Sequence, residues 1–375
     1  MDNRPFCAWP WFHQRVAPNG AMSPCCAWAG EKTKLDHKSF FHSEFMNNIR
    51  QSFADGKPHS NACDQCLYHE KVGKHSQRMA SFDIAERLNV NYLAPVRLQS
   101  QEVNLSNLCN LKCRTCSPNR STKWMSDADA VGYDNQGYVE SNWELGDSVD
   151  DMQMIMLLGG EPLLHEAEII ANLEKIEQRG RLNEISIYFT TNCTVKLSDR
   201  LIELLSKTKL ASFLCSIDAY GPLNDYIRSD SVWEEIENNI KNLCDLRFRY
   251  KNFKMKINSV ISVFNAEHYD RLLQWGIDMN IECACSPCSW PKIHDARNLP
   301  TDYKKQIIEK YLRFRETIPN DRRHIIDSVI KHLRNDNLIQ EPTWKELFQK
   351  HNIALDDRRS VRLQDYNSAL FASVA

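Results

Sequence analysis

Three cysteines lie close together in the segment Cys109-Asn-Leu-Lys-Cys113-Arg-Thr-Cys116, which has the spacing C-x3-C-x2-C. Thiolates at such short separations are typical ligands of zinc or of an iron–sulfur cluster. Four thiolates would complete the coordination of a cubane cluster, whereas three leave one iron open to another ligand. The spacing favours a cluster with an open iron. A zinc knuckle and unrelated buried thiols are the alternatives, because cysteine spacing alone is ambiguous.

A second motif, Gly159-Gly160-Glu161-Pro162, follows the short apolar run from Met152 to Leu158. Two glycines let a backbone approach a ligand closely, and a carboxylate beside them can receive an ammonium group. The same four residues also fit a glycine turn before a helix that starts with proline.

The two motifs, in this order and one strand apart, resemble those of the radical S-adenosylmethionine (SAM) superfamily. In that family the three cysteines hold a [4Fe–4S] cluster whose open iron binds the amino and carboxylate groups of SAM. The resemblance implies that Cys109, Cys113 and Cys116 hold this cluster, and that an electron from a reductase, flavodoxin or ferredoxin leads to cleavage of SAM. The resulting 5′-deoxyadenosyl radical takes a hydrogen atom from the substrate.

The resemblance also implies SAM-binding residues at the GGEP motif and at the ends of later strands. We expect them to be Gly159, Gly160, Glu161, Asn192, Ser216, Asp218 and Arg228. Ser216 and Asp218 fit a helix cap or turn almost equally well. The guanidinium of Arg228 could grip the SAM carboxylate or pair with Asp230.

From about residue 93 the sequence alternates between predicted strands and helices, which indicates successive β–α units and a parallel sheet. We expect strands near 97–105, 153–159, 184–191, 211–218, 254–263 and 281–285. We expect helices near 120–129, 164–179, 198–207, 231–249 and 267–279. Six such units resemble the partial (β/α)6 barrel of the radical SAM fold, an α/β architecture in which functional residues gather where the strands end.

The first 92 residues contain a second group of cysteines. Cys7 and Cys25 flank a predicted hairpin turn at Pro18-Asn-Gly20, and Cys63 and Cys66 form a later C-x2-C. The first part resembles the start of SPASM and twitch modules, which usually follow a radical SAM core and here would precede it. The four residues are predicted to hold an auxiliary [4Fe–4S] cluster, with Cys26 as a spare. A zinc site and simple packing are the alternatives.

Cys283, Cys285 and Cys288 lie at the expected end of the sixth strand. They could bind another cluster, complete the auxiliary one or donate a hydrogen atom to a substrate radical, although packed thiols remain an alternative. Cys193, Cys215 and Cys244 lie in or beside apolar runs and are predicted to be packed thiols.

Composition restricts the classes of partner. The 375 residues contain 47 Lys and Arg against 49 Asp and Glu, so no net charge favours nucleic acid or an anionic membrane. No apolar run approaches the roughly 20 residues of a membrane-spanning helix. Fourteen cysteines without an export signal indicate a reducing cytoplasm.

We expect three parts: a cysteine-rich domain in 1–92, a partial barrel in 93–290 and a helical extension in 291–375. Residues 131–150 are expected to form a polar loop or a lid. Enzymes with SPASM or twitch modules most often modify ribosomally made peptides, so a peptide is the favoured substrate. The alternatives are oxidation or epimerisation of a sugar or cyclitol, a non-catalytic metal-binding scaffold and a zinc-dependent regulator.

Overall fold

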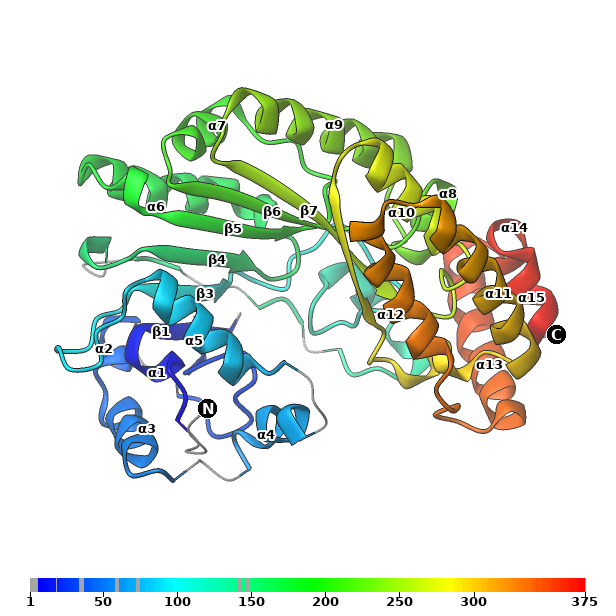
Figure 1. Ribbon diagram of the computed structural model, residues 1–375, viewed down its shortest axis with the longest axis horizontal. Coiled ribbons are helices and arrows are strands. Elements are labelled where there is room, and N and C mark those ends of the chain that lie inside the picture. Colours follow the sequence, from blue (N-terminus) through cyan, green and yellow to red (C-terminus); the bar gives the residue numbers. More distant parts are fainter. Residues whose placement is uncertain are drawn as a thin grey trace. The chain divides into compact units, whose positions relative to one another are not determined.

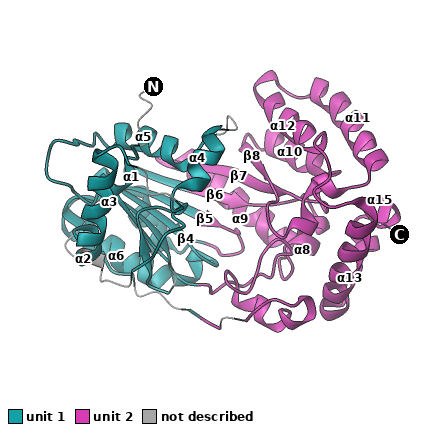
Figure 2. Cartoon of the chain, turned by 90° about the horizontal axis from the view of Figure 1, so that it is seen from below, with its two compact units in different colours: residues 1–106, 139–189, 197–212 teal, residues 107–138, 190–196, 213–375 magenta. Residues whose placement is uncertain are grey.

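The computed structural model describes residues 6–17, 19–33, 37–57, 61–71, 75–135, 137–139, 143–145 and 149–374. The chain divides into two compact units, which Figure 2 colours separately. Unit 1 contains residues 1–106, 139–189 and 197–212, and unit 2 contains residues 107–138, 190–196 and 213–375. The chain therefore passes between the units several times. The predicted division into three consecutive parts stays a prediction.

Most strands are parallel and are joined by helices, as the alternating pattern predicts (Figure 1). The strands have the sheet order β2-β1-β3-β4-β5-β6-β7-β8. Their bounds are β1 His13–Val16, β2 Met22–Ser23, β3 Ser100–Asn104, β4 Met154–Leu158, β5 Ser186–Thr191, β6 Leu210–Ser216, β7 Phe253–Ile261 and β8 Glu282–Pro287. The pairs β3–β4, β4–β5 and β7–β8 are parallel, and each of the six strands expected from the sequence is present.

Amphipathic patterns explain the helices that connect these strands. They are α6 Glu166–Gln178, α7 Asp199–Ser206, α8 Pro222–Ile227, α9 Trp233–Arg249 and α10 Tyr269–Asp278. In α7 the Ser198 side chain accepts a hydrogen bond from the Leu201 backbone N–H, and Asp199 lies in the first turn. Leu201, Leu204 and Leu205 of this helix are buried, which is the stripe that packs against a sheet.

One predicted helix is wrong. The segment 120–129 forms two short 3-10 turns, η1 Thr122–Ser126 and η2 Asp129–Val131. The second turn ends at Gly132, whose φ of 70° is readily adopted only by glycine. This stretch is short and its apolar residues do not form a long continuous face, so packing would not stabilise an α-helix here.

The N-terminal segment adds a hairpin to the sheet. Strand β1 pairs antiparallel with β2, as expected, and Gly20 has a φ of 72°, whereas Pro18 of the predicted turn lies outside the described residues. Strand β1 also pairs in parallel with β3, with His13 opposite Ser100, a pairing that the sequence did not indicate. The helices of this segment are α1 Trp9–Phe12, α2 His37–Phe41, α3 Glu44–Ala54, α4 Asp64–Lys71 and α5 Gln77–Arg87.

The C-terminal residues are helical, and Figure 1 shows them from orange to red. Their helices are α11 Thr301–Thr317, α12 Arg323–Leu333, α13 Glu341–Arg359, α14 Leu363–Tyr366 and α15 Ser368–Val374. Helix α13 is long: Pro342 lies in its first turn, where proline is well tolerated, and Ser360 ends it in the left-handed conformation. In the described part of the chain no helix is both long enough and apolar enough to cross a bilayer.

Candidate functional site

The three-cysteine motif lies on the loop after β3, within unit 2. Cys109 and Cys113 are buried and Cys116 is half-buried, and fully buried Leu111 packs among them. Burial raises the pKa of Cys116 to about 12, and the nearby Cys113 and Cys109 thiolates add to the increase. Buried thiols of this kind become thiolates when a bound metal supplies compensating positive charge.

A single metal ion and a cluster require different arrangements of their ligands. In the residues that the structure describes, no group of three or more His, Cys, Asp or Glu side chains surrounds one metal-ion position. A zinc ion needs its four ligands around one point, whereas a cubane presents separate irons to its thiolates.

Arg228 is a buried cation beside this loop. Its Nη1 donates to Asp218 Oδ2 at 2.9 Å, so the carboxylate partner is Asp218 rather than Asp230, which lies 3.9 Å from Lys123 Nζ. The Nε of Arg228 is buried and has no hydrogen-bond partner among the described residues. The carbonyls on either side of Arg228, those of Ile227 and Ser229, accept from the Arg114 and Lys112 N–H groups at 2.7 and 3.0 Å, which places Arg228 beside the cysteine loop. A positive group with an unused N–H fits an anionic cofactor.

Asp218 has partners for both of its carboxylate oxygens. Oδ1 accepts from the Val260 backbone N–H at 2.8 Å, and Oδ2 accepts from Arg228. Its own backbone N–H donates to Asn224 Oδ1 at 3.1 Å. Asp218 therefore ties the end of β6 to β7 and α8, and it orients Arg228. Ser216 is half-buried at the last position of β6.

Asn192 connects the end of β5 to the cysteine loop. Its Nδ2 donates to Asn110 Oδ1 at 3.0 Å and lies 3.9 Å from Cys109 Sγ. Its Oδ1 accepts from the Thr194 backbone N–H at 3.0 Å. Asn192, Asp218 and Arg228 are thus brought to the same loop, although they come from three separate parts of the sequence.

The GGEP motif belongs to unit 1 and is held against the end of β3. Gly160 N–H donates to Ser106 O at 2.8 Å, and a Cβ at Gly159 would lie only 2.8 Å from the same oxygen. Gly159 also has a φ of 140°, so glycine is required here. Glu161 is 1% exposed, and its Oε1 accepts from Leu163 N–H at 3.1 Å, which caps the turn η4 Pro162–His165.

The four predicted auxiliary ligands all belong to unit 1. Burial raises the pKa of Cys7 to about 12, and the charges of Cys63 and Cys66 raise it further. Burial, with the charges of Cys7, Cys26 and Cys66, also raises the pKa of Cys25. Cys26 has a different environment. Desolvation of its thiol and the nearby charge of Glu102 raise its pKa, whereas the charge of Arg15 lowers it.

The cysteines of β8 have separate environments. A Cβ at Gly276 of α10 would clash with Cys283 Sγ, and Cys285 Sγ lies 3.5 Å from Ser328 Oγ of α12, so both pack against helices. Cys288 is buried, and its Sγ donates to Trp290 O at 3.2 Å. Burial and the charges of Cys288 and Cys116 raise the pKa of Tyr133 to about 12, so these two thiols share a neighbour.

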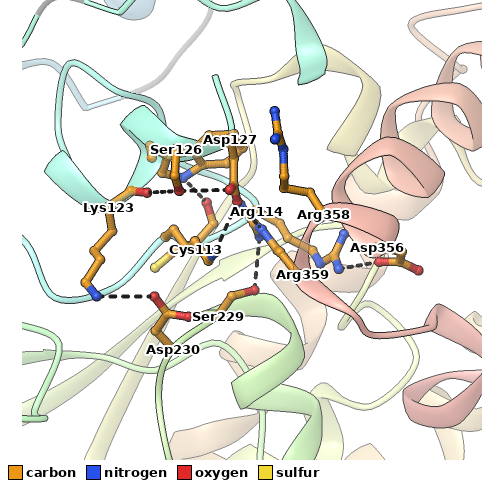
Figure 3. A network of polar contacts seen from close by, with 12 residues as sticks. Cys113, Arg114, Lys123, Ser126, Asp127, Ser229, Asp230, Asp356, Arg358 and Arg359 are labelled. Carbon is orange, nitrogen blue, oxygen red and sulfur yellow. Dashed lines mark hydrogen bonds and ion pairs between the residues drawn. The ribbon is translucent and has the colours of Figure 1, made fainter. Parts of the chain in front are cut away.

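Residues that the sequence analysis missed surround the cysteine loop (Figure 3). Trp124 Nε1 donates to the Cys113 carbonyl at 2.8 Å, and Arg359 of α13 lies 4.8 Å from the Trp124 ring centroid. Arg114, inside the motif itself, is completely buried. Its position between two cysteines was the only signal in the sequence. No local pattern distinguishes Arg359 from the exposed arginines of the extension.

Comparison with known proteins places these residues in a recognised domain. The model of the radical SAM superfamily matches residues 103–276. A curated relative, GTP 3',8-cyclase of Synechocystis sp., is 27% identical over 172 residues, which are 44% of this chain and 46% of that protein. The chain thus matches under half of the relative's length.

Two solved structures are similar at low identity. Native anSMEcpe with bound AdoMet is 16% identical with a TM-score of 0.43, covering 58% of this chain and 61% of that chain. SuiB of Streptococcus suis bound to precursor peptide SuiA is 14% identical with a TM-score of 0.36, covering 96% and 80%. The match to the radical SAM superfamily model includes both the cysteine triplet and the GGEP motif.

Proposed function

We propose that this chain is an enzyme that reductively cleaves SAM and abstracts a hydrogen atom from its substrate. The observation that carries the proposal is that the superfamily match contains a buried three-thiol loop beside Arg228, whose Nε is buried without a hydrogen-bond partner in the described residues. Cys109, Cys113 and Cys116 would hold the [4Fe–4S] cluster. When bound, the cluster and SAM supply the electron and the 5′-deoxyadenosyl radical.

The protein's own residues would bind and orient these groups. Arg228 would offer positive charge and a free N–H to the anionic cofactors, while Asp218 fixes its orientation through the ion pair at 2.9 Å. Asn192 would stabilise the loop by its hydrogen bond to Asn110. Glu161, already fixed by the Leu163 N–H, would receive the ammonium group of SAM.

An auxiliary [4Fe–4S] cluster on Cys7, Cys25, Cys63 and Cys66 is the second part of the proposal. The mutual influence of these thiolates supports it, as does the different environment of Cys26. Such a cluster could accept the electron that remains after hydrogen abstraction. The resemblance to SPASM and twitch modules makes a ribosomally made peptide the favoured substrate, with a reductase, flavodoxin or ferredoxin as electron donor.

The test uses anaerobically reconstituted protein with dithionite and SAM. We expect 5′-deoxyadenosine from the natural protein and none from variants in which Cys109, Cys113 or Cys116 is replaced by Ala. A matched control is Cys244→Ala, because the Cys244 thiol is half-buried and contacts Met255 Sδ at 3.6 Å, away from the motif. Full SAM cleavage by any triplet variant would contradict the proposal, and so would a colourless natural protein that contains zinc and no iron.

The substrate class requires a separate measurement. Deuterated candidate peptides and deuterated sugars or cyclitols would be incubated with the active enzyme. Mass spectrometry of the 5′-deoxyadenosine then shows which substrate donates its label. Label transfer from a peptide supports the proposal, and transfer only from a small molecule would replace peptide modification by small-molecule oxidation or epimerisation.

A further inference from the structure

The C-terminal helix α13 is fastened to the cysteine loop through Arg114. The Arg114 side chain is 0% exposed, its Nη1 donates to Asn352 Oδ1 at 2.9 Å, and its Nη2 pairs with Asp356. The guanidinium carbon also lies 3.8 Å from the ring centroid of Tyr226. Asn352 and Asp356 are one helical turn apart on the same face of α13.

The same helix brings a second buried arginine to the loop. The Arg359 side chain is only 2% exposed; its Nε donates to Asp127 Oδ2 at 2.7 Å and its Nη1 to Ser229 Oγ at 3.0 Å (Figure 3). It lies over Trp124, which donates to the Cys113 carbonyl. Its Nη2 is buried and has no hydrogen-bond partner among the described residues. One N–H group of Arg359 therefore remains available to a further acceptor.

Among the described residues, the ion pairs beside the loop contain four cations and three carboxylates. Arg114 pairs with Asp356 and Arg228 pairs with Asp218, one carboxylate for each cation. Asp127, in contrast, serves both Arg359 and Lys112, whose Nζ lies 3.4 Å away. These ion pairs leave one positive charge in excess. Such a charge is costly inside a protein unless an anion compensates it.

A [4Fe–4S] cluster on three thiolates is an anion, and one-electron reduction makes it more negative. We propose that Arg359 is a positioning residue for this cluster, and that α13 brings its guanidinium to the Cys113 side of the loop to stabilise the reduced state. This inference rests on the proposed function. The reduction adds one electron from the external donor to the cluster, with no bond broken and no proton transferred.

Two further arguments favour Arg359. Ser229 links this arginine to the residue next to Cys113, because its carbonyl accepts from the Lys112 N–H at 3.0 Å while its hydroxyl accepts from Arg359 Nη1 at 3.0 Å. Arginine also keeps its charge in a buried site better than lysine does, because its pKa is much higher. A permanent positive charge in a low-dielectric environment acts strongly on a nearby anion.

The test compares Arg359→Gln with the neighbouring change Arg358→Gln in the reconstituted full chain. Arg358 is 43% exposed and pairs with Asp129 at 2.6 Å, so its replacement removes the same charge one residue away from the loop-facing position. A redox titration would follow, by electron paramagnetic resonance, the cluster signal that changes when SAM is added. Iron content and the melting temperature are measured for each protein.

We expect Arg359→Gln to lower the equilibrium constant for reduction at least tenfold, which for one electron corresponds to about 59 mV. Arg359→Lys should lie closer to the natural protein, and Arg358→Gln should leave the potential unchanged. An unchanged potential in iron-loaded Arg359→Gln would overturn the inference. So would an equal shift in Arg358→Gln, because the effect would then be a general surface charge.

If Arg359→Gln does not retain iron, Arg359→Lys decides the question. Retention of iron by the lysine variant supports a role of the positive charge. Loss of iron in both variants means that only the shape of arginine matters, and this result overturns the proposal.

The proposed function and this inference predict different failures. A natural protein without iron or without SAM cleavage contradicts the proposed function, while normal SAM cleavage with an unshifted Arg359→Gln potential contradicts this inference alone.

Discussion

Replacement of Asp356 by Asn tests how strongly α13 is coupled to the cysteine loop. Four groups donate hydrogen bonds to the Asp356 carboxylate. They are Arg114 Nη2, Tyr226 OH at 3.0 Å, Asn352 Nδ2 at 3.3 Å and Leu363 N–H at 2.9 Å. An amide would direct its NH2 group at one of these donors. It would also leave Arg114 buried without its counter-charge.

The expected magnitude follows from that burial. Removing one partner of a buried ion pair costs about 3–5 kcal/mol, which is a large part of the roughly 5–15 kcal/mol that stabilises a typical domain. For a domain of roughly 150–250 residues, this loss lowers the melting temperature by about 6–20 °C. Burial of Arg114 at 0% exposure justifies the use of the buried-pair value rather than the much smaller surface value.

The assay is urea and thermal unfolding of the full chain, followed by tryptophan fluorescence. Trp124 and Trp344 are completely buried in unit 2 and report on the loop region and on α13. The matched control is Asp129→Asn, which breaks the exposed pair with Arg358 and should change stability by under about 1 kcal/mol. A loss below about 1 kcal/mol in Asp356→Asn would refute the reasoning, because Arg114 would then be compensated without this carboxylate.

A double variant separates the charge from the packing. Arg114→Met with Asp356→Leu replaces both charges by apolar side chains, and removing a buried pair together is often close to neutral. We therefore expect it to recover most of the stability lost in Asp356→Asn. A double variant as unstable as the single one would show that the hydrogen bonds of Tyr226, Asn352 and Leu363 dominate.

Three further results are expected. Glu161→Gln keeps an oxygen for the Leu163 N–H but loses the charge for the SAM ammonium, so equilibrium dialysis should show SAM binding weakened by roughly ten- to a hundredfold with the iron content unchanged; equal affinity would reduce the motif to a turn. Replacing Cys63 and Cys66 by Ala should lower iron from about eight to about four per chain and leave SAM cleavage intact, and full iron retention would exclude these ligands. Changing the three cysteines of residues 283–288 to Ala should leave the iron content unchanged, whereas a loss of about four irons would make them cluster ligands.

The repeating features of the fold could be predicted from the sequence. Alternation of apolar residues located the six strands, and amphipathic periodicity located α6, α7, α9 and α10. The segment 120–129 failed because a short stretch with a nearby glycine has too little apolar surface to select between α and 3-10 geometry. The β1–β3 pairing was missed because His13 and Ser100 are far apart in the sequence, and nothing in a four-residue strand identifies its partner.

The candidate site shows the same division between local and distant information. Cys109, Cys113, Cys116 and the two glycines are recognisable because chemistry fixes their spacing. Asp218 was predicted as a ligand, yet the structure commits both of its oxygens to Val260 and Arg228, a use that spacing cannot reveal. The type of an amino acid does not show whether it binds the cofactor itself or orients a neighbouring residue that does.

The predicted helical extension of residues 291–375 contains neither the cysteine triplet nor the GGEP motif. Arg114 nevertheless finds its counter-charge there, 242 residues along the chain, and the partner helix also supplies Arg359. A buried arginine needs a carboxylate wherever the fold can provide one, so the charge inside the motif is satisfied only when α13 is in place. Folding of the cysteine loop and docking of α13 are therefore coupled within unit 2. Residues that support the cysteine loop therefore also come from α13, far along the chain from the cysteines themselves.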